Sequence, residues 1–270
     1  MISSTSNQQV KNIAALQKKT ALRNKENCFI IEGIKLFSEV PSHRIIKSYV
    51  TDTFFENLSA DMKKKVETSP YELVSDEVFK KMSDTVTPQG ILTVVRRTVL
   101  PVTEIIRDEE KTGDTVKSKS RLFLLLEDIN DPGNLGTILR TSEAAGVRGI
   151  IMSRNTVDIY NPKVVRSTMG AIFRMPFTYT ESMEETIELL KSNGIRIYAA
   201  HLKGKEEYYR KDYRQPTAFI IGNESNGISE AVAQQADELI KIPMLGRVES
   251  LNAACAATIL MYEVMRQNIV

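Results

Sequence analysis

Three short polar runs in the second half of the chain hold the residues best suited to bind a ligand or to do chemistry. Each run contains or follows an apolar stretch that is typical of a buried strand. Glycines at a strand end let the backbone approach a ligand closely, and α/β proteins usually bind ligands at such ends. The runs are EDINDPGNLGTILRTSEAAG (127–146), FIIGNESNGIS (219–229) and IPMLGRVESLNAACA (242–256). Their side chains able to donate or to carry charge include Asn134, Arg140, Glu224, Ser250 and Asn252.

The second run has the spacing of a phosphate-binding loop but lacks its charge. Gly222 and Gly227 are spaced as in a P-loop, yet Ile228 stands where that loop needs a lysine. We therefore exclude a nucleoside triphosphatase, and the lack of a G-x-G-x-x-G string argues against a dinucleotide fold. Glycines and backbone amides with few charges suit a ligand such as an adenine with its ribose.

The third run leads into a long apolar helix, predicted over 251–267. Ser250 is a candidate N-cap for this helix, which would place Asn252 in the first helical turn, close to a ligand at that end. Capping alone accounts for Ser250 equally well.

The elements that must position these runs alternate in type. We predict strands at 121–127, 149–153, 195–200, 217–222 and 238–244, and helices at 135–145, 161–167, 183–192 and 251–267. Continuous apolar strands that alternate with helices predict an α/β fold whose parallel sheet is covered on both faces.

The first part of the chain predicts a smaller α/β domain. Its helices are expected at 7–20, 34–40 and 61–68, and its strands at 28–33, 48–52, 71–75 and 90–97. The segment DEEKTGDTVKSKS, over 108–120, is polar and has no apolar periodicity, so it is predicted to be a linker. The expected domains are therefore 1–107 and 121–270.

Composition excludes several classes of protein. Hydrophobic residues make up 42% and charged residues 26% of the 270 residues. No apolar run is long enough to span a membrane, and the N-terminus has no apolar signal region, so we expect a cytoplasmic protein. Cys28 and Cys255 cannot form a disulfide framework or a zinc site, and no metal is expected. The first 25 residues carry five basic side chains and no acid, which fits either phosphate contact or a solvated helix face.

Taken together, the three runs resemble the three signature motifs of the SpoU/TrmH family of RNA ribose 2′-O-methyltransferases, in the SPOUT superfamily. The first motif corresponds to Asp131, Pro132, Asn134, Gly136 and Arg140, and the second to Gly222, Glu224 and Gly227. The third corresponds to Ile242, Pro243, Met244, Gly246, Ser250, Leu251 and Asn252. CFIIEGIKLFSEV and TPQGILTVV resemble the family's substrate-binding domain, mainly through Glu32-Gly33 and Pro88-Gln89-Gly90.

The resemblance implies a trefoil-knotted catalytic domain, an N-terminal RNA-binding domain and a homodimer that packs through the helix at 253–265. It implies methyl transfer from S-adenosylmethionine to a ribose 2′-hydroxyl of RNA, with 23S ribosomal RNA favoured. The implied cofactor-binding residues are Ala199, Gly222, Asn223, Ile242, Met244, Leu251 and Asn252. The implied catalytic residues are Asn134, Arg140, Glu224, Ser250 and Asn252.

A guanidinium is a poor general base, because its pKa lies above about 12. Our hypothesis is that Arg140 holds the RNA phosphate and stabilises the emerging alkoxide, while Asn134 orients the nucleotide. His201 follows a predicted strand, but we expect it to be a bystander. Arg166 and Arg174 either contact RNA or are simply solvated.

Two alternatives stay open. The same chemistry could act on transfer RNA, although the additional N-terminal domain favours ribosomal RNA. The chain could also be a catalytically inactive RNA-binding relative, which the intact set of motif residues disfavours.

Overall fold

The computed structural model describes residues 1–107 and 121–269, so the predicted linker at 108–120 lies outside the described residues. The chain forms two compact units. The first comprises Met1–Thr98 with Asp158–Phe173, and the second comprises Val99–Val157 with Arg174–Val270. Within the described ranges, no helix is both long and apolar enough to cross a membrane.

The second unit is built on a seven-stranded sheet in the order β7-β6-β5-β10-β8-β11-β9. All of its neighbouring strands are parallel, which confirms the predicted parallel sheet. The strands are β5 (Leu122–Leu126), β6 (Gly149–Ser153), β7 (Phe177–Thr180), β8 (Arg196–Ala200), β9 (Glu206–Glu207), β10 (Thr217–Ile221) and β11 (Glu238–Lys241).

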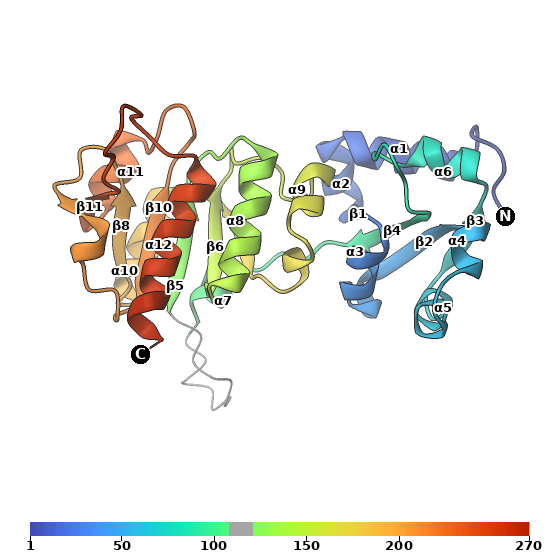
Figure 1. The fold of residues 1–270 in the computed structure, drawn as a ribbon, viewed down its shortest axis with the longest axis horizontal. Helices are drawn as coiled ribbons and strands as arrows, with labels where there is room; N and C mark the ends of the chain where they lie inside the picture. Colours follow the sequence, from blue (N-terminus) through green and yellow to red (C-terminus); the bar gives the residue numbers. More distant parts are fainter. Residues whose placement is uncertain (108–120, 270) are drawn as a thin grey trace. The chain divides into compact units, whose positions relative to one another are not determined.

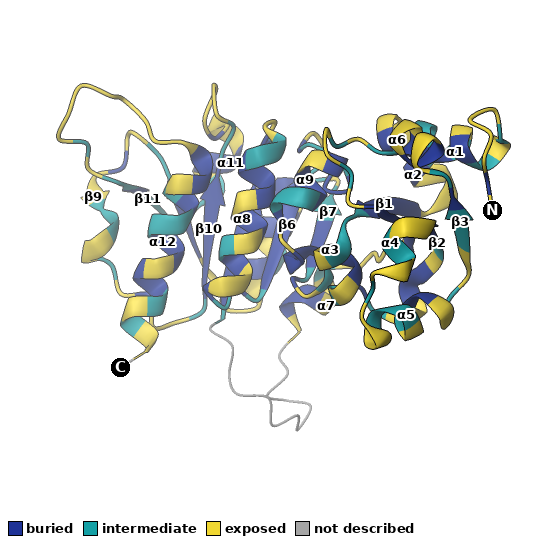
Figure 2. Cartoon of the chain, turned by 45° about the vertical axis from the view of Figure 1, so that its right-hand side comes forward, coloured by how far each residue is buried: buried dark blue, intermediate teal, exposed yellow. Residues whose placement is uncertain are grey.

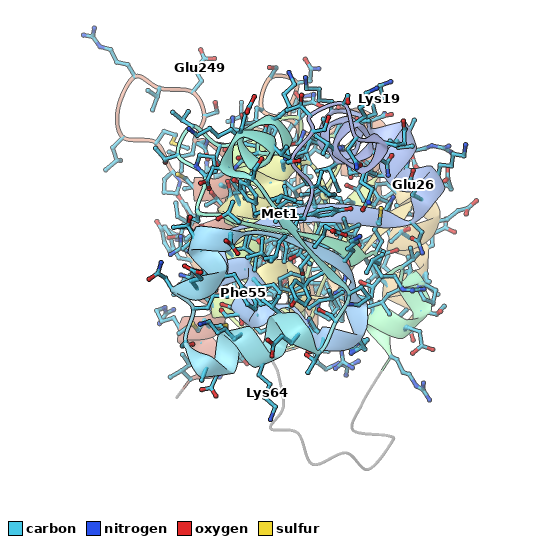
Figure 3. All side chains as sticks on the ribbon, turned by 90° about the vertical axis from the view of Figure 1, so that its right-hand side faces the viewer. Met1, Lys19, Glu26, Phe55, Lys64 and Glu249 are labelled. Atoms are coloured by element: carbon cyan, nitrogen blue, oxygen red, sulfur yellow. The ribbon has the colours of Figure 1, made fainter. Side chains whose placement is uncertain are left out.

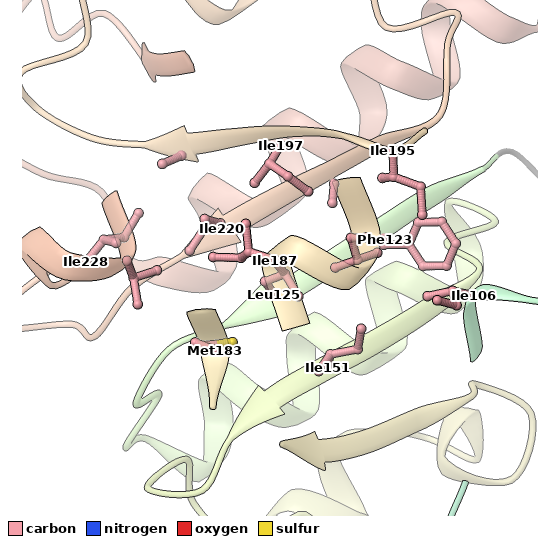
Figure 4. Packing of buried hydrophobic residues seen from close by; sticks show 14 of the residues in the cluster. Ile106, Phe123, Leu125, Ile151, Met183, Ile187, Ile195, Ile197, Ile220 and Ile228 are labelled. Atoms are coloured by element: carbon pink, nitrogen blue, oxygen red, sulfur yellow. The ribbon is translucent and has the colours of Figure 1, made fainter. Parts of the chain in front are cut away.

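Helices cover both faces of this sheet (Figure 1). The helix α8 (Pro132–Ala144) packs beside α12 (Ala253–Asn268) on one face. On the other face, α7 (Val102–Ile106), α10 (Met183–Ser192) and α11 (Glu230–Gln235) enclose a hydrophobic cluster. Figure 4 shows Leu125 and Ile220 of the strands gathered with Ile187 of α10 in this cluster. The helices expose their outer sides, whereas the strands β6 and β10 are coloured as buried (Figure 2).

The two central strands of the sheet, β5 and β10, determine where a ligand site can form. Every residue of β5 and β10 is buried, because each strand has neighbours on both sides and helices on both faces. From β5 the chain proceeds through β6 to β7 on one side, then crosses to β8 and β10 on the other. Loops that leave the carboxyl ends of β5 and β10 therefore lie together at a topological switch point, where open α/β sheets bind ligands.

The first unit contains a four-stranded mixed sheet in the order β1-β4-β2-β3. Its strands are β1 (Cys28–Glu32), β2 (Ile45–Thr51), β3 (Tyr71–Val74) and β4 (Ile91–Arg96). Only the β2–β3 pair is parallel. The helices are α1 (Gln8–Lys18), α2 (Thr20–Glu26), α3 (Ile34–Glu39), α4 (Asp52–Glu56), α5 (Ala60–Glu67), α6 (Asp76–Met82) and α9 (Pro162–Ser167). Charged side chains such as Lys19, Glu26 and Lys64 project from its surface (Figure 3).

The segment Asp158–Phe173, which includes α9, packs into the first unit although the sequence on either side belongs to the second. The buried Arg23 guanidinium forms an ion pair of 2.6 Å with Asp158, and it also donates to the carbonyls of Leu16 and Gln17. The Tyr160 hydroxyl donates to the Thr98 carbonyl at 2.9 Å. These contacts attach the inserted segment to the α1–α2 turn and to the end of β4.

Candidate cofactor and active site

The loop after β10 folds into a tight turn in which two glycines are required. The backbones of Asn223 and Gly227 exchange hydrogen bonds of 3.0 and 2.9 Å. A Cβ at Gly222 would lie 2.3 Å from the Gly227 carbonyl carbon, so no side chain fits there. Gly227 itself has a φ of +69°, in the left-handed region that glycine adopts without strain.

Asn223 attaches this turn to the loop after β5. Its side-chain oxygen accepts from the backbone N–H groups of Ser225 and Asn226, at 2.8 and 3.0 Å. Its side-chain amide donates to the Asp128 carbonyl at 2.7 Å. The turn and the loop are therefore held as one piece, independently of any ligand.

The Glu224 carboxylate accepts three hydrogen bonds from the run that follows β5. The backbone N–H groups of Asn130 and Asp131 each donate at 3.1 Å, and the Asn134 side-chain amide donates at 2.8 Å. Partial burial raises the pKa of Glu224, but these hydrogen bonds outweigh it. The pKa of this carboxyl consequently lies below its usual value, and the group is ionised at neutral pH.

Asn134 also forms a hydrogen bond with the third run, through Asn252. Its side-chain oxygen accepts from the Asn252 amide at 2.7 Å, and the Asn252 oxygen accepts from the backbone N–H groups of Ala254 and Cys255 at the start of α12. A continuous chain of hydrogen bonds therefore joins Glu224, Asn134 and Asn252, one residue from each of the three polar runs.

The prediction that Ser250 caps the last helix is wrong. Asn252 is the N-cap, and the helix begins at Ala253, two residues later than predicted. The Asn252 oxygen accepts from two backbone N–H groups of the first turn, whereas Ser250 is exposed on the preceding loop. Figure 3 shows Glu249 on the same loop.

A cavity of about 320 Å³ lies between the loops that follow β8, β10 and β11. Five predicted cofactor-binding residues line it: Gly222, Asn223, Ile242, Met244 and Leu251. Glu224 and Ser250, predicted as catalytic, also contribute to its wall. Asn252 is not one of the lining residues, but it begins the helix whose Ala253 and Ala256 reach the cavity.

Two placements differ from, or add to, what the sequence suggested. Ala199 is fully buried in the hydrophobic cluster, and its neighbour Ala200 lines the cavity instead. His201, expected to be a bystander, also lines the cavity, and its Nδ1 accepts from the Lys203 backbone at 3.1 Å. Its position directly after β8 is the sequence signal that pointed there, because this strand ends at the same edge as β10.

Arg140 lies apart from the cavity lining, on the exposed side of α8 about two turns from its N-terminus. Within the part of the chain that the structure describes, its guanidinium has no hydrogen bond or ion pair. The other two arginines considered for RNA contact have acidic neighbours: Arg174 pairs with Glu143 at 2.8 Å and Arg166 with Asp84 at 3.1 Å.

The residues present fit S-adenosylmethionine. The cavity volume lies in the range of small-molecule sites, roughly 300–1,000 Å³. Its apolar wall of Ile242, Met244 and Leu251 can hold an adenine, and the polar side chains of Ser225 and Ser250 in the lining can bind a ribose and an amino-acid moiety. No cluster of three or more metal-ligating side chains occurs in the described ranges.

Comparison with known proteins assigns both parts of the chain. Residues 121–262 match the SpoU rRNA Methylase family, and residues 7–93 match the MRM3-like substrate binding domain. The chain is 32% identical over 262 residues to the 23S rRNA (guanosine(2553)-2′-O)-methyltransferase RlmP of Bacillus subtilis, with 97% of each chain covered.

Solved structures agree with this assignment. The AdoMet-bound rRNA methyltransferase from Sinorhizobium meliloti superposes with a TM-score of 0.85 at 28% identity, covering 100% of this chain and 98% of the other. The SpoU methyltransferase AviRb from Streptomyces viridochromogenes, in complex with AdoMet, gives 0.84 at 26% identity, covering 97% and 98%. The resemblance seen in the sequence is thereby confirmed, and the chain belongs to the SpoU rRNA methylase family.

Proposed function

We propose that this chain transfers a methyl group from S-adenosylmethionine to a ribose 2′-hydroxyl of 23S ribosomal RNA. The observation that carries the proposal is the hydrogen-bonded chain Glu224–Asn134–Asn252 beside the glycine-walled cavity. It brings one residue from each of three distant runs to the edge of a cavity that suits the cofactor.

The cofactor would be held by Gly222, Asn223, Ile242, Met244 and Leu251. When bound, it supplies an electrophilic methyl group on a sulfonium. The residues of the chain must then exclude water, orient the acceptor ribose and stabilise the charge that develops on its oxygen. Asn252 supports the cavity through the helix that it caps, and Ala199 supports it from behind through the adjacent Ala200.

Glu224 is suited to orienting rather than to abstracting the proton. Three donors already occupy its carboxylate, and its lowered pKa makes it a weak base. Arg140 is better suited to contact RNA, because its guanidinium is exposed and unpaired within the described ranges. In this proposal it binds the phosphate beside the acceptor ribose and stabilises the alkoxide, while Asn134 and Ser250 position the nucleotide.

The remaining parts of the proposal concern the whole protein. The N-terminal unit binds the RNA, in keeping with its match to a substrate-binding domain. The catalytic unit has the trefoil knot of the family, and the chain works as a homodimer through α12, where the exposed Tyr262 offers an apolar contact. We propose the cytoplasm as its location, since the substrate is ribosomal RNA.

Ribosomal RNA is preferred to transfer RNA because the relative named for 23S rRNA is similar over 97% of both chains, including the N-terminal part. An inactive RNA-binding relative is disfavoured because Asn134, Arg140, Glu224, Ser250 and Asn252 are all present.

The first test separates cofactor binding from methyl transfer. S-adenosylmethionine should raise the melting temperature of the wild-type protein, and labelled methyl groups should then appear at one 2′-hydroxyl of 23S rRNA. Gly222→Ala should abolish the melting shift, because its Cβ collides with the Gly227 backbone. Arg214→Ala, at an exposed arginine outside the cavity lining, is the control and should keep the shift.

The second test concerns Arg140. Arg140→Ala should lower kcat about 100-fold or more with cofactor binding unchanged, as expected when a charge-stabilising donor is lost. Arg140→Lys keeps the charge but cannot form bidentate hydrogen bonds, so its kcat should lie between those of the wild type and Arg140→Ala. Arg214→Ala, at an exposed arginine paired with Asp212, should have no effect. Wild-type turnover by Arg140→Ala would remove Arg140 from the reaction.

A further inference from the structure

A second cavity, of about 290 Å³, shares the wall formed by Asn223, Asn226 and Gly227 with the cofactor cavity. Unlike the cofactor cavity, the second cavity has no apolar side chain in its lining of described residues. It consists of two carboxylates, four asparagines, a serine and a glycine, and no lysine or arginine of the described chain reaches it. Because it lacks cations, it is unsuited to phosphate, and because it lacks apolar side chains, it is unsuited to a hydrophobic group.

Asp128 lines this cavity, and hydrogen bonds hold both its backbone and its carboxylate in place. Its φ is +55°, in the left-handed region that aspartate adopts more readily than most residues with a side chain. Its backbone N–H donates to the Ser153 hydroxyl at 2.8 Å, and that hydroxyl donates back to one carboxylate oxygen at 2.6 Å. Asn155 donates to the other oxygen at 3.3 Å. A carboxylate has about four acceptor sites, so each oxygen can accept one more donor.

The second cavity also contains side-chain amides that can donate hydrogen bonds to a ligand. The side-chain amides of Asn130 and Asn226 line the cavity, and neither has a hydrogen-bond partner within the described ranges. The Glu127 carboxylate, in contrast, has a structural role, because it accepts hydrogen bonds from the backbone N–H and the hydroxyl of Ser229 at the start of α11. The cavity therefore offers the Asp128 carboxylate as acceptor and two free amides as donors.

We infer that this second cavity receives the base of the acceptor nucleotide and selects guanine. Guanine presents two adjacent donors, N1–H and the N2 amino group, which a carboxylate can accept together, and a neighbouring O6 that an amide can donate to. Adenine has no N1–H, and uracil presents a single donor between two acceptors. The inference rests on the proposed function, since the shared wall lets one nucleotide place its ribose at the cofactor cavity and its base in this one.

The test uses a synthetic RNA that spans the methylation site mapped on 23S rRNA, made with guanosine, inosine or adenosine at the acceptor position. Inosine lacks only the N2 amino group. Wild-type kcat/KM should fall about tenfold from guanosine to inosine and further with adenosine, as expected when a hydrogen bond to a charged group is lost.

Asp128→Asn should bring the guanosine-to-inosine ratio close to one, because the amide no longer accepts two donors. It should still bind S-adenosylmethionine like the wild type, which shows that the loop is folded. Asp212→Asn, an exposed carboxylate outside both cavities, should keep the tenfold ratio.

The outcomes separate the two proposals. If the wild type methylates no RNA, the proposed function fails and the base cavity fails with it. If the wild type methylates a uridine, cytidine or adenosine, or if Asp128→Asn keeps the tenfold ratio, the methyltransferase stands and the guanine cavity is overturned.

Discussion

The Glu224 side chain is exposed, yet its carboxylate accepts three hydrogen bonds, so the pH dependence of stability can test whether these bonds form. Its hydrogen bonds from Asn130, Asp131 and Asn134 favour the ionised form and, against the effect of partial burial, hold its pKa below the usual carboxyl value. A lowered pKa in the folded state adds stability above the usual carboxyl pKa, and that stability is lost as the pH falls through the lowered value.

Glu224→Gln should therefore be less stable than the wild type at pH 7, and the difference should disappear at strongly acidic pH. Because the side chain is exposed, solvent screening limits the loss to about 0.5 kcal/mol. Urea unfolding at a series of pH values between 7 and 3 measures it, with Glu188→Gln on the exposed side of α10 as the control. A difference that persists unchanged at acid pH would show that the carboxylate charge is not the cause.

At the scale of elements, the N-cap residue of α12 also donates a hydrogen bond within the site. Asn252 has two separable roles, since its oxygen caps the helix and its amide donates to Asn134. Asn252→Ala removes both and should cost about 1–2 kcal/mol of unfolding free energy and most of the activity.

Asn252→Asp keeps the capping oxygen but loses the donor, so its stability should stay near the wild-type value while turnover falls. Ser250→Ala should leave the unfolding free energy unchanged, because Ser250 does not cap the helix. Denaturant midpoints together with methyl transfer rates distinguish these results. A loss of stability in Ser250→Ala would contradict the assignment of Asn252 as the N-cap.

The elements with strong periodicity were predictable from the sequence, and the short ones were not. The strand at 149–153 and the helix at 183–192 match the prediction residue for residue. The strand β7 was missed because FTYT alternates with polar residues at the sheet edge, and α11 because six residues are too few to show a helical period.

The site was predictable as a set of residues but not as a network. Motif spacing indicated Asn134, Glu224 and Asn252, whereas their mutual bonds join positions 90 and 118 residues apart. Only the sheet order brings those loops to one edge. The cap at Asn252 was misplaced because serine and asparagine are equally good N-caps by type, and the backbone geometry decides between them.

At the scale of the molecule, the inserted segment Asp158–Phe173 makes the first unit depend on chain from the middle of the sequence. Its main polar attachment is the Arg23–Asp158 pair, in which the side chains are 2% and 13% exposed. Removing one partner of a buried pair leaves an uncompensated charge, so Asp158→Ala should destabilise the first unit by about 3 kcal/mol.

The cofactor cavity lies entirely in the second unit, which predicts a separable response to ligand. At 100 times its dissociation constant, S-adenosylmethionine should stabilise the unit that binds it by about 2.7 kcal/mol. In scanning calorimetry of the full chain, we expect Asp158→Ala to split the unfolding into two transitions. The lower one should be insensitive to the cofactor and the upper one should rise with it. If Asp158→Ala instead unfolded in a single transition that the cofactor raised, the two units would unfold as one cooperative body, and the Arg23–Asp158 pair would not be what couples them.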